Sequence, residues 1–174
     1  MTTDKFSKPL QACAQVTARL IHRFESIPQS LIAFIGRFSI AAVFWQSAQT
    51  KVDNFSIDLI AGNFQLGWPQ LSDSAVALFR DEYKIPLMAP ELAAPLAAVA
   101  EHLLALLLLL GLGSRFAACG LLITTLVIQI FVYPDAYPTH GTWIAVLLFI
   151  MVYGPGRISL DYALNRHIQK LIRG

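Results

Sequence analysis

The sequence predicts an all-α integral membrane protein built as a four-helix transmembrane bundle, and three observations support this fold class. Hydrophobic residues make up 56% of the 174 residues and charged residues only 14%, against about 25% in a typical soluble domain. The apolar residues gather in four stretches whose lengths suit helices that cross a ~30 Å hydrocarbon core. Basic and acidic segments alternate between these stretches, as the loops of a multi-pass membrane protein do.

The chain divides into a leader at residues 1–30, a membrane domain at residues 31–155 and a basic tail at residues 156–174. The connections between the last three apolar stretches are short, so these helices are expected to be antiparallel neighbours in one compact bundle. The four spans are predicted at about 28–49, 92–112, 116–133 and 138–153.

The leader contains an amphipathic pattern. Within residues 9–27, apolar side chains recur at helical spacing, whereas Arg19, His22 and Arg23 lie largely off that stripe. This pattern is typical of a helix that lies in the cytoplasmic headgroup layer. The alternative is a solvated leader without fixed structure.

The long connection between the first two spans, residues 50–90, is rich in Asp, Gly and Pro. Ser72 or Asp73 is placed to cap a short helix whose apolar face carries Ala75, Val76 and Phe79. We therefore expect one or two short helices over the outer mouth of the bundle. The alternative is an unstructured surface loop.

Charge predicts the topology. The segment before the first span carries four basic and two acidic residues, and the tail carries four basic and one acidic. The loop from residue 50 to 91 carries three basic and six acidic residues. The turn at Arg115 is basic and the turn at Asp135 is acidic. The positive-inside rule then places both termini in the cytoplasm and the 50–90 loop outside.

Inside the spans the charged residues are one arginine, Arg37, and one carboxylate, Glu101. Arg37 lies ~13 Å into the first span, and Glu101 lies ~15 Å inward from Glu91, so the two depths nearly match. Because an unpaired charge at mid-membrane is costly, we predict a buried Arg37–Glu101 ion pair, with His102 or a serine completing its hydrogen bonds. The pair either fixes helix register only, or forms the floor of a polar cavity that binds a headgroup or relays protons.

A second set of polar side chains falls at the outer ends of the spans and is predicted to form an outer polar pocket above this pair. For any single member, ordinary interfacial polarity explains the residue as well, although Gln46 and Gln129 lie deeper than an interface requires. The set comprises Gln46, Gln49, Lys51, Gln129, Tyr133, Asp135, His140 and Trp143.

Other chemistries lack their sequence signatures. The net charge of +2, without a basic patch interleaved with aromatics, argues against nucleic-acid binding. No HxxxH, CxxC or HExxH spacing occurs, so no metal site is predicted. No phosphate-binding glycine loop or nucleophile–base pair is present, so a self-contained enzyme is not expected and no catalytic residue is assigned.

Several motifs in order resemble the DoxX family of small bacterial inner-membrane proteins. They are RFSIAAVFWQSAQTKV from Arg37, LFRDEYKIPLMAPELAA, AEHLLALLLLLGLGSRFAA with Glu101, VIQIFVYPDAYPTH with His140, and GPGRISLD at residues 154–161. The resemblance covers roughly residues 31–165. It implies a four-span bundle in the bacterial inner membrane and association with redox systems. The span-one stretch AAVFWQSAQ departs from the small, glycine-rich stretch that is common in the family.

Three hypotheses about function follow. The first is a membrane subunit of a redox complex that contacts quinone or a periplasmic partner, with no cofactor held within the chain alone. The second is a small-solute or metal-stress transporter, against which the apolar run from Leu103 to Leu110 argues. The third is an accessory or assembly protein without its own chemistry, whose 50–90 loop binds a protein partner. The first is favoured slightly over the third, and self-association is left open.

Overall fold

The computed structural model describes residues 4–58, 62–86 and 88–173, with the side chains of residues 13–58, 62–86 and 88–172. Four helical segments are long and apolar enough to cross a membrane, which confirms the predicted four-helix membrane bundle. The first two spans are the single helices α2, Gln29–Gln49, and α4, Pro90–Leu110. The third span, Ser114–Val132, consists of α5, Ser114–Val127, and the π-helical turn η2, Ile128–Val132. The fourth span, Pro134–Tyr153, consists of the 3-10 turn η3, Pro134–Ala136, and α6, Tyr137–Tyr153.

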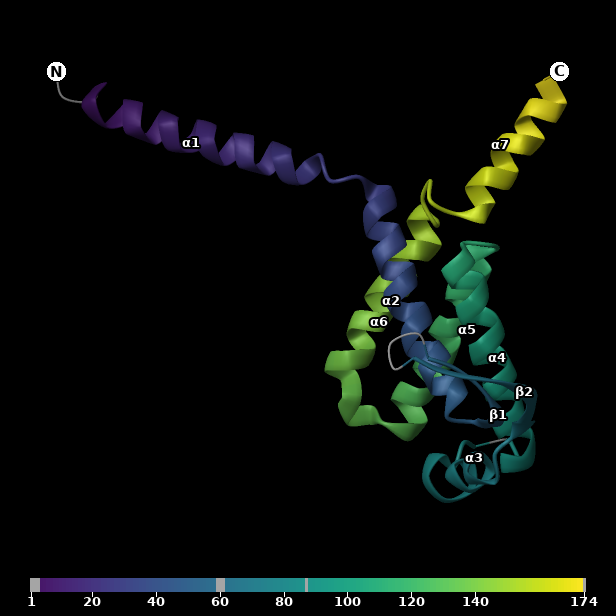
Figure 1. Ribbon diagram of the computed structural model, residues 1–174. Helices are drawn as coiled ribbons and strands as arrows, with labels where there is room; N and C mark the ends of the chain where they lie inside the picture. Colours follow the sequence, from purple (N-terminus) through teal and green to yellow (C-terminus); the bar gives the residue numbers. More distant parts are fainter. Residues whose placement is uncertain (1–3, 59–61, 87, 174) are drawn as a thin grey trace.

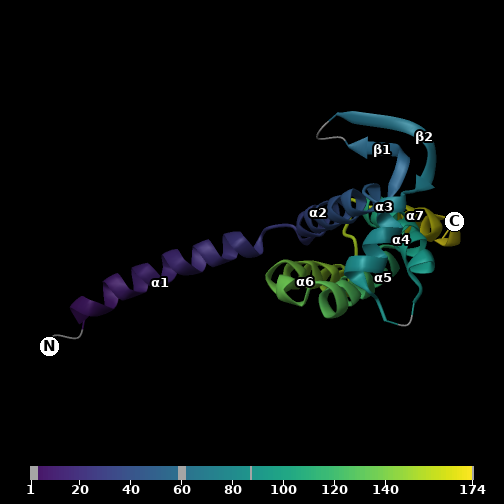
Figure 2. The same cartoon turned by 90° about the horizontal axis from the view of Figure 1, so that it is seen from below.

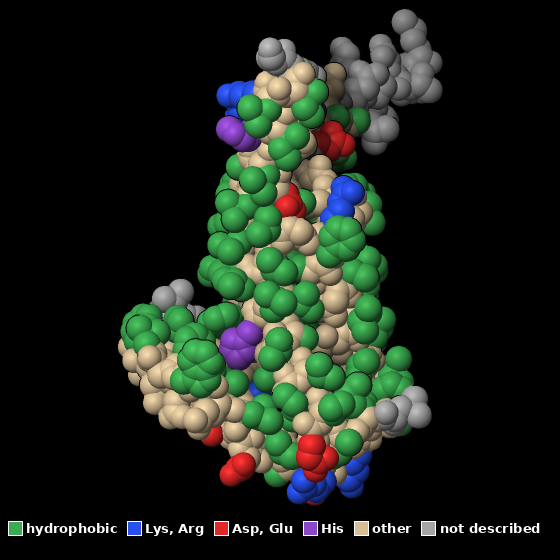
Figure 3. Space-filling model, turned by 90° about the vertical axis from the view of Figure 1, so that its right-hand side faces the viewer, with side chains coloured by type: hydrophobic (Ala, Val, Ile, Leu, Met, Phe, Trp, Pro, Cys, Tyr) green, Lys and Arg blue, Asp and Glu red, His purple; other side chains and the backbone are tan. Residues whose placement is uncertain are grey.

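The four spans form a closed ring in which α2 packs on α4 and α6, and α5 packs on α4 and α6 (Figure 1). Small residues let the helices approach closely, as is usual between membrane helices. Ala41, Ala105 and Ala118 are almost fully buried beside Phe44 and Leu121. The outward faces remain apolar, and Figure 3 shows charged side chains gathered near the two ends of the bundle with a mainly apolar flank between them.

Two further helices leave the bundle at one end, which we call the terminal end (Figure 1). The helix expected within residues 9–27 is present as α1, Asp4–Glu25. The basic tail, for which no helix was predicted, forms α7, Leu160–Arg173. Five of its exposed apolar side chains lie on one helical stripe, and Tyr162 lies off it; the five are Leu160, Leu164, Ile168, Leu171 and Ile172.

The connection between α2 and α4 begins with a β-hairpin that the sequence reasoning missed. Strands β1, Val52–Asp58, and β2, Asn63–Leu71, pair antiparallel. We interpreted the Asp, Gly and Pro residues there as loop signals, but Phe64, Leu66 and Trp68 alternate with polar or small residues, which is the period of a strand. The turn after the hairpin does contain the expected helix, as α3, Asp73–Leu78, and the π-helical turn η1, Phe79–Tyr83.

The hairpin lies on one flank of the bundle, beside α2 and α4, whereas α6 lies on the other side (Figure 2). We call the end of the bundle that carries the hairpin, α3 and η1 the hairpin end. Residue Ser72 is the N-cap of α3 by position, but its hydroxyl bonds the Ser74 hydroxyl at 2.7 Å rather than a backbone N–H. Because Ser72 N–H donates to the Lys51 carbonyl at 3.0 Å, the base of the hairpin is closed directly at the end of α2.

Candidate functional site

A buried ion pair joins the end of α2 to the middle of α4. Lys51 follows the last turn of α2, and its Nζ lies 2.7 Å from Oε2 of Glu101. Both side chains are only 3% exposed. The ammonium also donates to the carbonyl of Ser47 at 3.0 Å and to its hydroxyl at 2.9 Å. All three N–H donors of Lys51 are therefore used, which is what a buried ammonium requires.

The predicted partner of Glu101 was wrong, because Arg37 does not reach it. Arg37 Nη1 donates to the carbonyls of Leu108 and Leu109, each at 3.0 Å, and Nη2 donates to the carbonyl of Ile158. Arg37 thus binds carbonyls of the last turn of α4, of which that of Leu108 also accepts the Gly111 N–H at 3.2 Å, and the helix dipole favours a cation there.

The direction of the side chains explains the error. Helical side chains tilt toward the N-terminus of their own helix. Since α2 and α4 are antiparallel, Arg37 extends toward the terminal end and Glu101 toward the hairpin end. Equal depth of the backbone therefore does not bring their charges together. Lys51, which we had placed in the outer pocket, reaches inward to take the place expected of Arg37.

A second set of contacts docks β1 onto the α2–α4 seam. Gln49 Oε1 accepts the Ile57 N–H at 2.8 Å, and Trp45 Nε1 donates to the Ile57 carbonyl at 3.0 Å. The Gln49 amide then faces Nε2 of His102 at 2.8 Å, while Nδ1 of His102 faces the carbonyl of Ala98 at 2.8 Å. This arrangement requires the neutral ring with its proton on Nδ1. His102 serves the hairpin rather than the ion pair.

The remaining outer polar residues form a separate cluster on α5 and α6. The Nδ1–H of buried His140 donates to Gln129 Oε1 at 2.7 Å, and Gln129 Nε2 donates to the carbonyl of Pro134 at 2.6 Å. The Trp143 ring lies 4.9 Å from the His140 ring and 5.7 Å from that of Phe44, centroid to centroid. These contacts hold the start of α6 against α5 and α2.

Tyr83 in η1 packs against Ala93 and Ala94 at the start of α4. Its ring packs edge-on against Tyr133 at 5.9 Å. Burial raises the pKa of Tyr83, and the negative charge of Glu101 acts in the same direction. The Tyr133 hydroxyl donates a hydrogen bond to the Glu82 carboxylate, and this bond is the main reason that the pKa of Tyr133 is raised. The turn η1 thus contacts both α4 and η2.

Two members of the predicted outer pocket lie outside these clusters. Gln46 is exposed on α2, and Asp135 is exposed in η3. The structure therefore divides the predicted pocket into the α2–α4 group, with Gln49 and Lys51, and the α5–α6 group. Among the described residues, no three His, Cys, Asp or Glu side chains are grouped so that they could hold a metal ion.

The family was tested by comparison with known proteins. Residues 32–134 match the family model described as DoxX. The chain belongs to the DoxX family. The match extends from α2 to the turn before α6, so it includes the Lys51–Glu101 pair, the hairpin and Gln129. It ends earlier than the resemblance we had noted, so His140 and residues 154–161 lie beyond it. Neither the curated proteins nor the solved structures that were searched gave a match.

Proposed function

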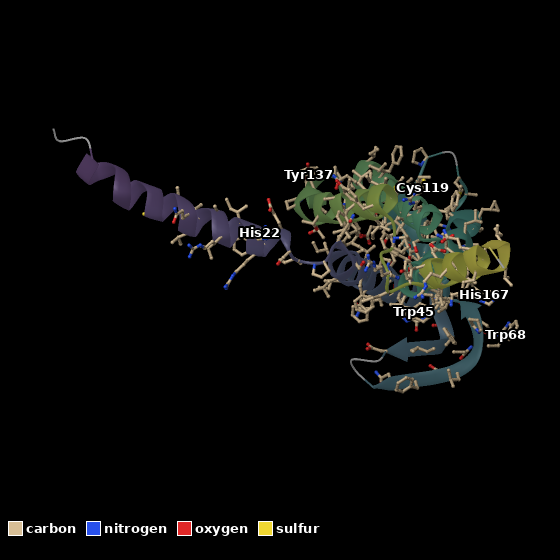
Figure 4. The ribbon with its side chains drawn as sticks, turned by 90° about the horizontal axis from the view of Figure 1, so that it is seen from above. His22, Trp45, Trp68, Cys119, Tyr137 and His167 are labelled. Carbon is tan, nitrogen blue, oxygen red and sulfur yellow. The ribbon has the colours of Figure 1, made fainter. Side chains whose placement is uncertain are left out.

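We propose that this DoxX protein is an accessory membrane subunit that binds a partner protein through the open edge of its β-hairpin. The observation that carries the proposal is the exposure of β2. Phe64, Leu66 and Trp68 are 62%, 78% and 84% exposed, on a strand that the bundle holds in place. Figure 4 shows Trp45 on the bundle side of the hairpin and Trp68 projecting from β2 away from α2.

The pairing of the strands identifies which backbone groups are free. The N–H and C=O of Ile57 are bonded to α2 side chains, so they point away from β2. Ile57 faces Phe64 and Phe55 faces Leu66 in the register. Opposed residues in an antiparallel pair direct their backbone groups either toward each other or both outward. The backbone groups of Phe64 and Leu66 are therefore directed outward, at the edge that also carries the exposed apolar side chains.

The position of the hairpin favours a protein over lipid as the occupant of this edge. Trp45 lies one turn before the end of α2, and His102, whose ring is 6.3 Å from that of Phe55, lies near the middle of α4. The hairpin thus lies beside the membrane spans (Figure 1). Lipid chains offer no partners to open backbone groups, which is why open sheet edges at that depth are covered by polypeptide. An added strand from a partner supplies both hydrogen bonds and apolar contacts.

The Lys51–Glu101 pair then serves to position the hairpin. It fixes the residue from which β1 starts, while Ser72 closes the hairpin on the carbonyl of that same residue. The Lys51 ammonium finds all three of its acceptors within the chain, which favours the accessory role over the quinone-binding role. Because the family resemblance implies association with redox systems, we propose that the partner is an inner-membrane redox protein. Both termini are then cytoplasmic and the hairpin lies on the periplasmic side, as the charge distribution favours.

A second candidate function has one observation in its favour. Tyr83 packs against the start of α4, the helix that carries Glu101, and its ring contacts Tyr133. A carboxylate, a lysine and two phenols in one region are groups that can pass protons to and from a reduced quinone. This candidate predicts that Glu101→Gln abolishes quinone-coupled activity in membranes where the hairpin remains docked.

The test of the main proposal is site-specific photo-crosslinking in native membranes. A photoreactive phenylalanine analogue is placed at Leu66, and at Ile123 as the control, which is 58% exposed on α5. We expect Leu66 to give one protein adduct of fixed stoichiometry, and Ile123 to give lipid adducts. The adduct should disappear when Trp68→Lys is added, and the partner should then no longer copurify with the intact chain. Lipid adducts alone from both positions would refute the proposal. An adduct with a second copy of this chain would show that the edge mediates self-association and would overturn the proposal of a redox partner.

A further inference from the structure

An open hollow lies at the terminal end, at the opposite end of the bundle from the hairpin. Its volume is about 580 Å³, and it lies between the start of α5, the end of α6 and the base of α7. Basic, aromatic and small polar side chains line it, among them Arg115, Arg157, Phe116, Tyr153 and Asn165. The hollow is thus located where two spans end, at the boundary of the apolar flank.

Two arginines supply positive charge to the hollow. Neither forms an ion pair with a carboxylate in the described part of the chain. Arg115 makes one long bond, from Nη2 to the carbonyl of Val152 at 3.4 Å, and its guanidinium lies against Gly154. The acidic residue that lines the hollow, Asp161, accepts bonds from the backbone of Gly113 and Ser114 at 2.8 and 3.1 Å. Its charge is therefore directed to the N-terminus of α5 rather than to the arginines.

The loop that carries Arg157 is fixed. Gly154 and Gly156 have φ of +80° and +79°, a conformation that favours glycine. A side chain at Gly156 would meet Ser30 Cα at 2.8 Å, so the loop packs directly on the start of α2. The Arg157 N–H also donates to the Ser30 hydroxyl at 3.1 Å. Since the backbone that carries Arg157 is held on both sides, only its side chain has to be ordered when a ligand binds, which lowers the entropic cost of binding.

The walls of the hollow favour an amphiphilic ligand over a free anion. Phe116 is 85% exposed and Tyr153 is 61% exposed, both at its rim and both on spans. A free anion would leave these rings uncovered, whereas acyl chains lying along α5 and α6 would cover them. The exposed stripe of α7 adds apolar surface at the same level, with Arg166 and Lys170 off that stripe. A helix of this kind is attracted to an anionic membrane surface.

We propose that this hollow is a binding site for the phosphate headgroup of an anionic phospholipid, held by Arg115 and Arg157 with the acyl chains along α5 and α6. Arginine is suited to the phosphate because its planar donors match two phosphate oxygens. The proposal is independent of the partner-binding function, since it concerns the opposite end of the bundle and different residues. Its consequence is a defined annular lipid at the base of α7.

The test uses the full-length protein in detergent micelles and native mass spectrometry. Phosphatidylglycerol is titrated against phosphatidylcholine, and inorganic phosphate is added in a separate arm. We expect one phosphatidylglycerol to be retained per chain and phosphatidylcholine to be released. Because a basic residue near an anionic surface contributes about fivefold in affinity, Arg115→Gln with Arg157→Gln should weaken retention about 25-fold.

The matched control is Arg166→Gln, which removes one exposed charge of α7 outside the hollow. We expect retention of the single lipid to be unchanged in this variant. An equal loss in Arg166→Gln would overturn the site, because general surface charge would then explain the binding. Saturable binding of inorganic phosphate without lipid retention would also overturn it. If the double variant fails to fold, Arg157→Gln alone is measured, with about fivefold loss expected and no loss contradicting the proposal.

Discussion

Neutralising Glu101 should destabilise the protein strongly, because it leaves the Lys51 ammonium buried without its counter-charge. The Glu101→Gln substitution keeps the size of the side chain and one oxygen that accepts from Lys51. It removes the charge at a position where both partners are 3% exposed. Removing one partner of such a pair typically costs about 3–5 kcal/mol, and we expect a value near the lower limit because the amide retains one hydrogen bond.

A double-mutant cycle isolates the interaction itself. Lys51→Met should cost at least as much as Glu101→Gln, because it leaves the carboxylate buried and unpaired without a retained hydrogen bond. The second single variant of the cycle is Glu101→Leu, which leaves the ammonium buried without any acceptor from residue 101. The combination of Lys51→Met with Glu101→Leu removes both charges and fills similar volume, so it should be closer to the wild type than either single variant of the cycle. The assay is reversible unfolding in mixed micelles by SDS titration, followed by tryptophan fluorescence.

The matched control is the exposed Arg80–Glu91 pair, whose side chains are 57% and 62% exposed. Glu91→Gln should leave the unfolding curve unchanged, since exposed pairs contribute little. The reasoning would be refuted if Glu101→Gln were as harmless as Glu91→Gln. It would also fail if the apolar double variant were as unstable as the sum of the two single variants.

The remaining predictions concern the other polar contacts. Arg37→Gln should cost about 2–4 kcal/mol in the same assay, because it frees buried carbonyls at the end of α4. Gln49→Leu should increase the hydrogen exchange of β1 in the purified protein, since it removes the hydrogen bonds to the Ile57 N–H and to His102. The helix content measured by circular dichroism should stay nearly unchanged. Because burial raises the pKa of Tyr83 in the folded state, the unfolded chain loses this phenolic proton first, near pH 10. Stability should therefore fall as pH rises above about 10, and Tyr83→Phe should reduce that fall.

The membrane spans could be predicted closely from the sequence. The first was expected at 28–49 and runs over Gln29–Gln49, and the third was expected at 116–133 and runs over Ser114–Val132. Long apolar runs and glycine or proline boundaries determine these limits locally, without information about packing. The same is true of the short helix α3, whose cap and apolar spacing are both visible in the sequence.

The pairing of charges could not be predicted in the same way, because it depends on where each side chain extends in the assembled bundle. Arg37 and Glu101 have matching backbone depths but extend toward opposite ends. Lys51 lies beyond the last turn of α2, and only the folded hairpin shows that its chain turns inward. The hairpin itself has a strand period in β2, but Asp53 and Pro69 obscured it. The apolar stripe of α7 has helical spacing in the sequence, but four basic residues are interleaved with it in the tail.

The central claim is that the free edge of β2 is covered by a partner protein in the membrane. Hydrogen exchange of the peptide that contains Phe64 and Leu66 tests it most directly, measured in native membranes and again in the purified chain in micelles. We predict strong protection in native membranes that is lost on purification and also lost in native membranes carrying Trp68→Lys. Equal, rapid exchange of this peptide in both preparations, with the bundle helices protected in each, would contradict the account.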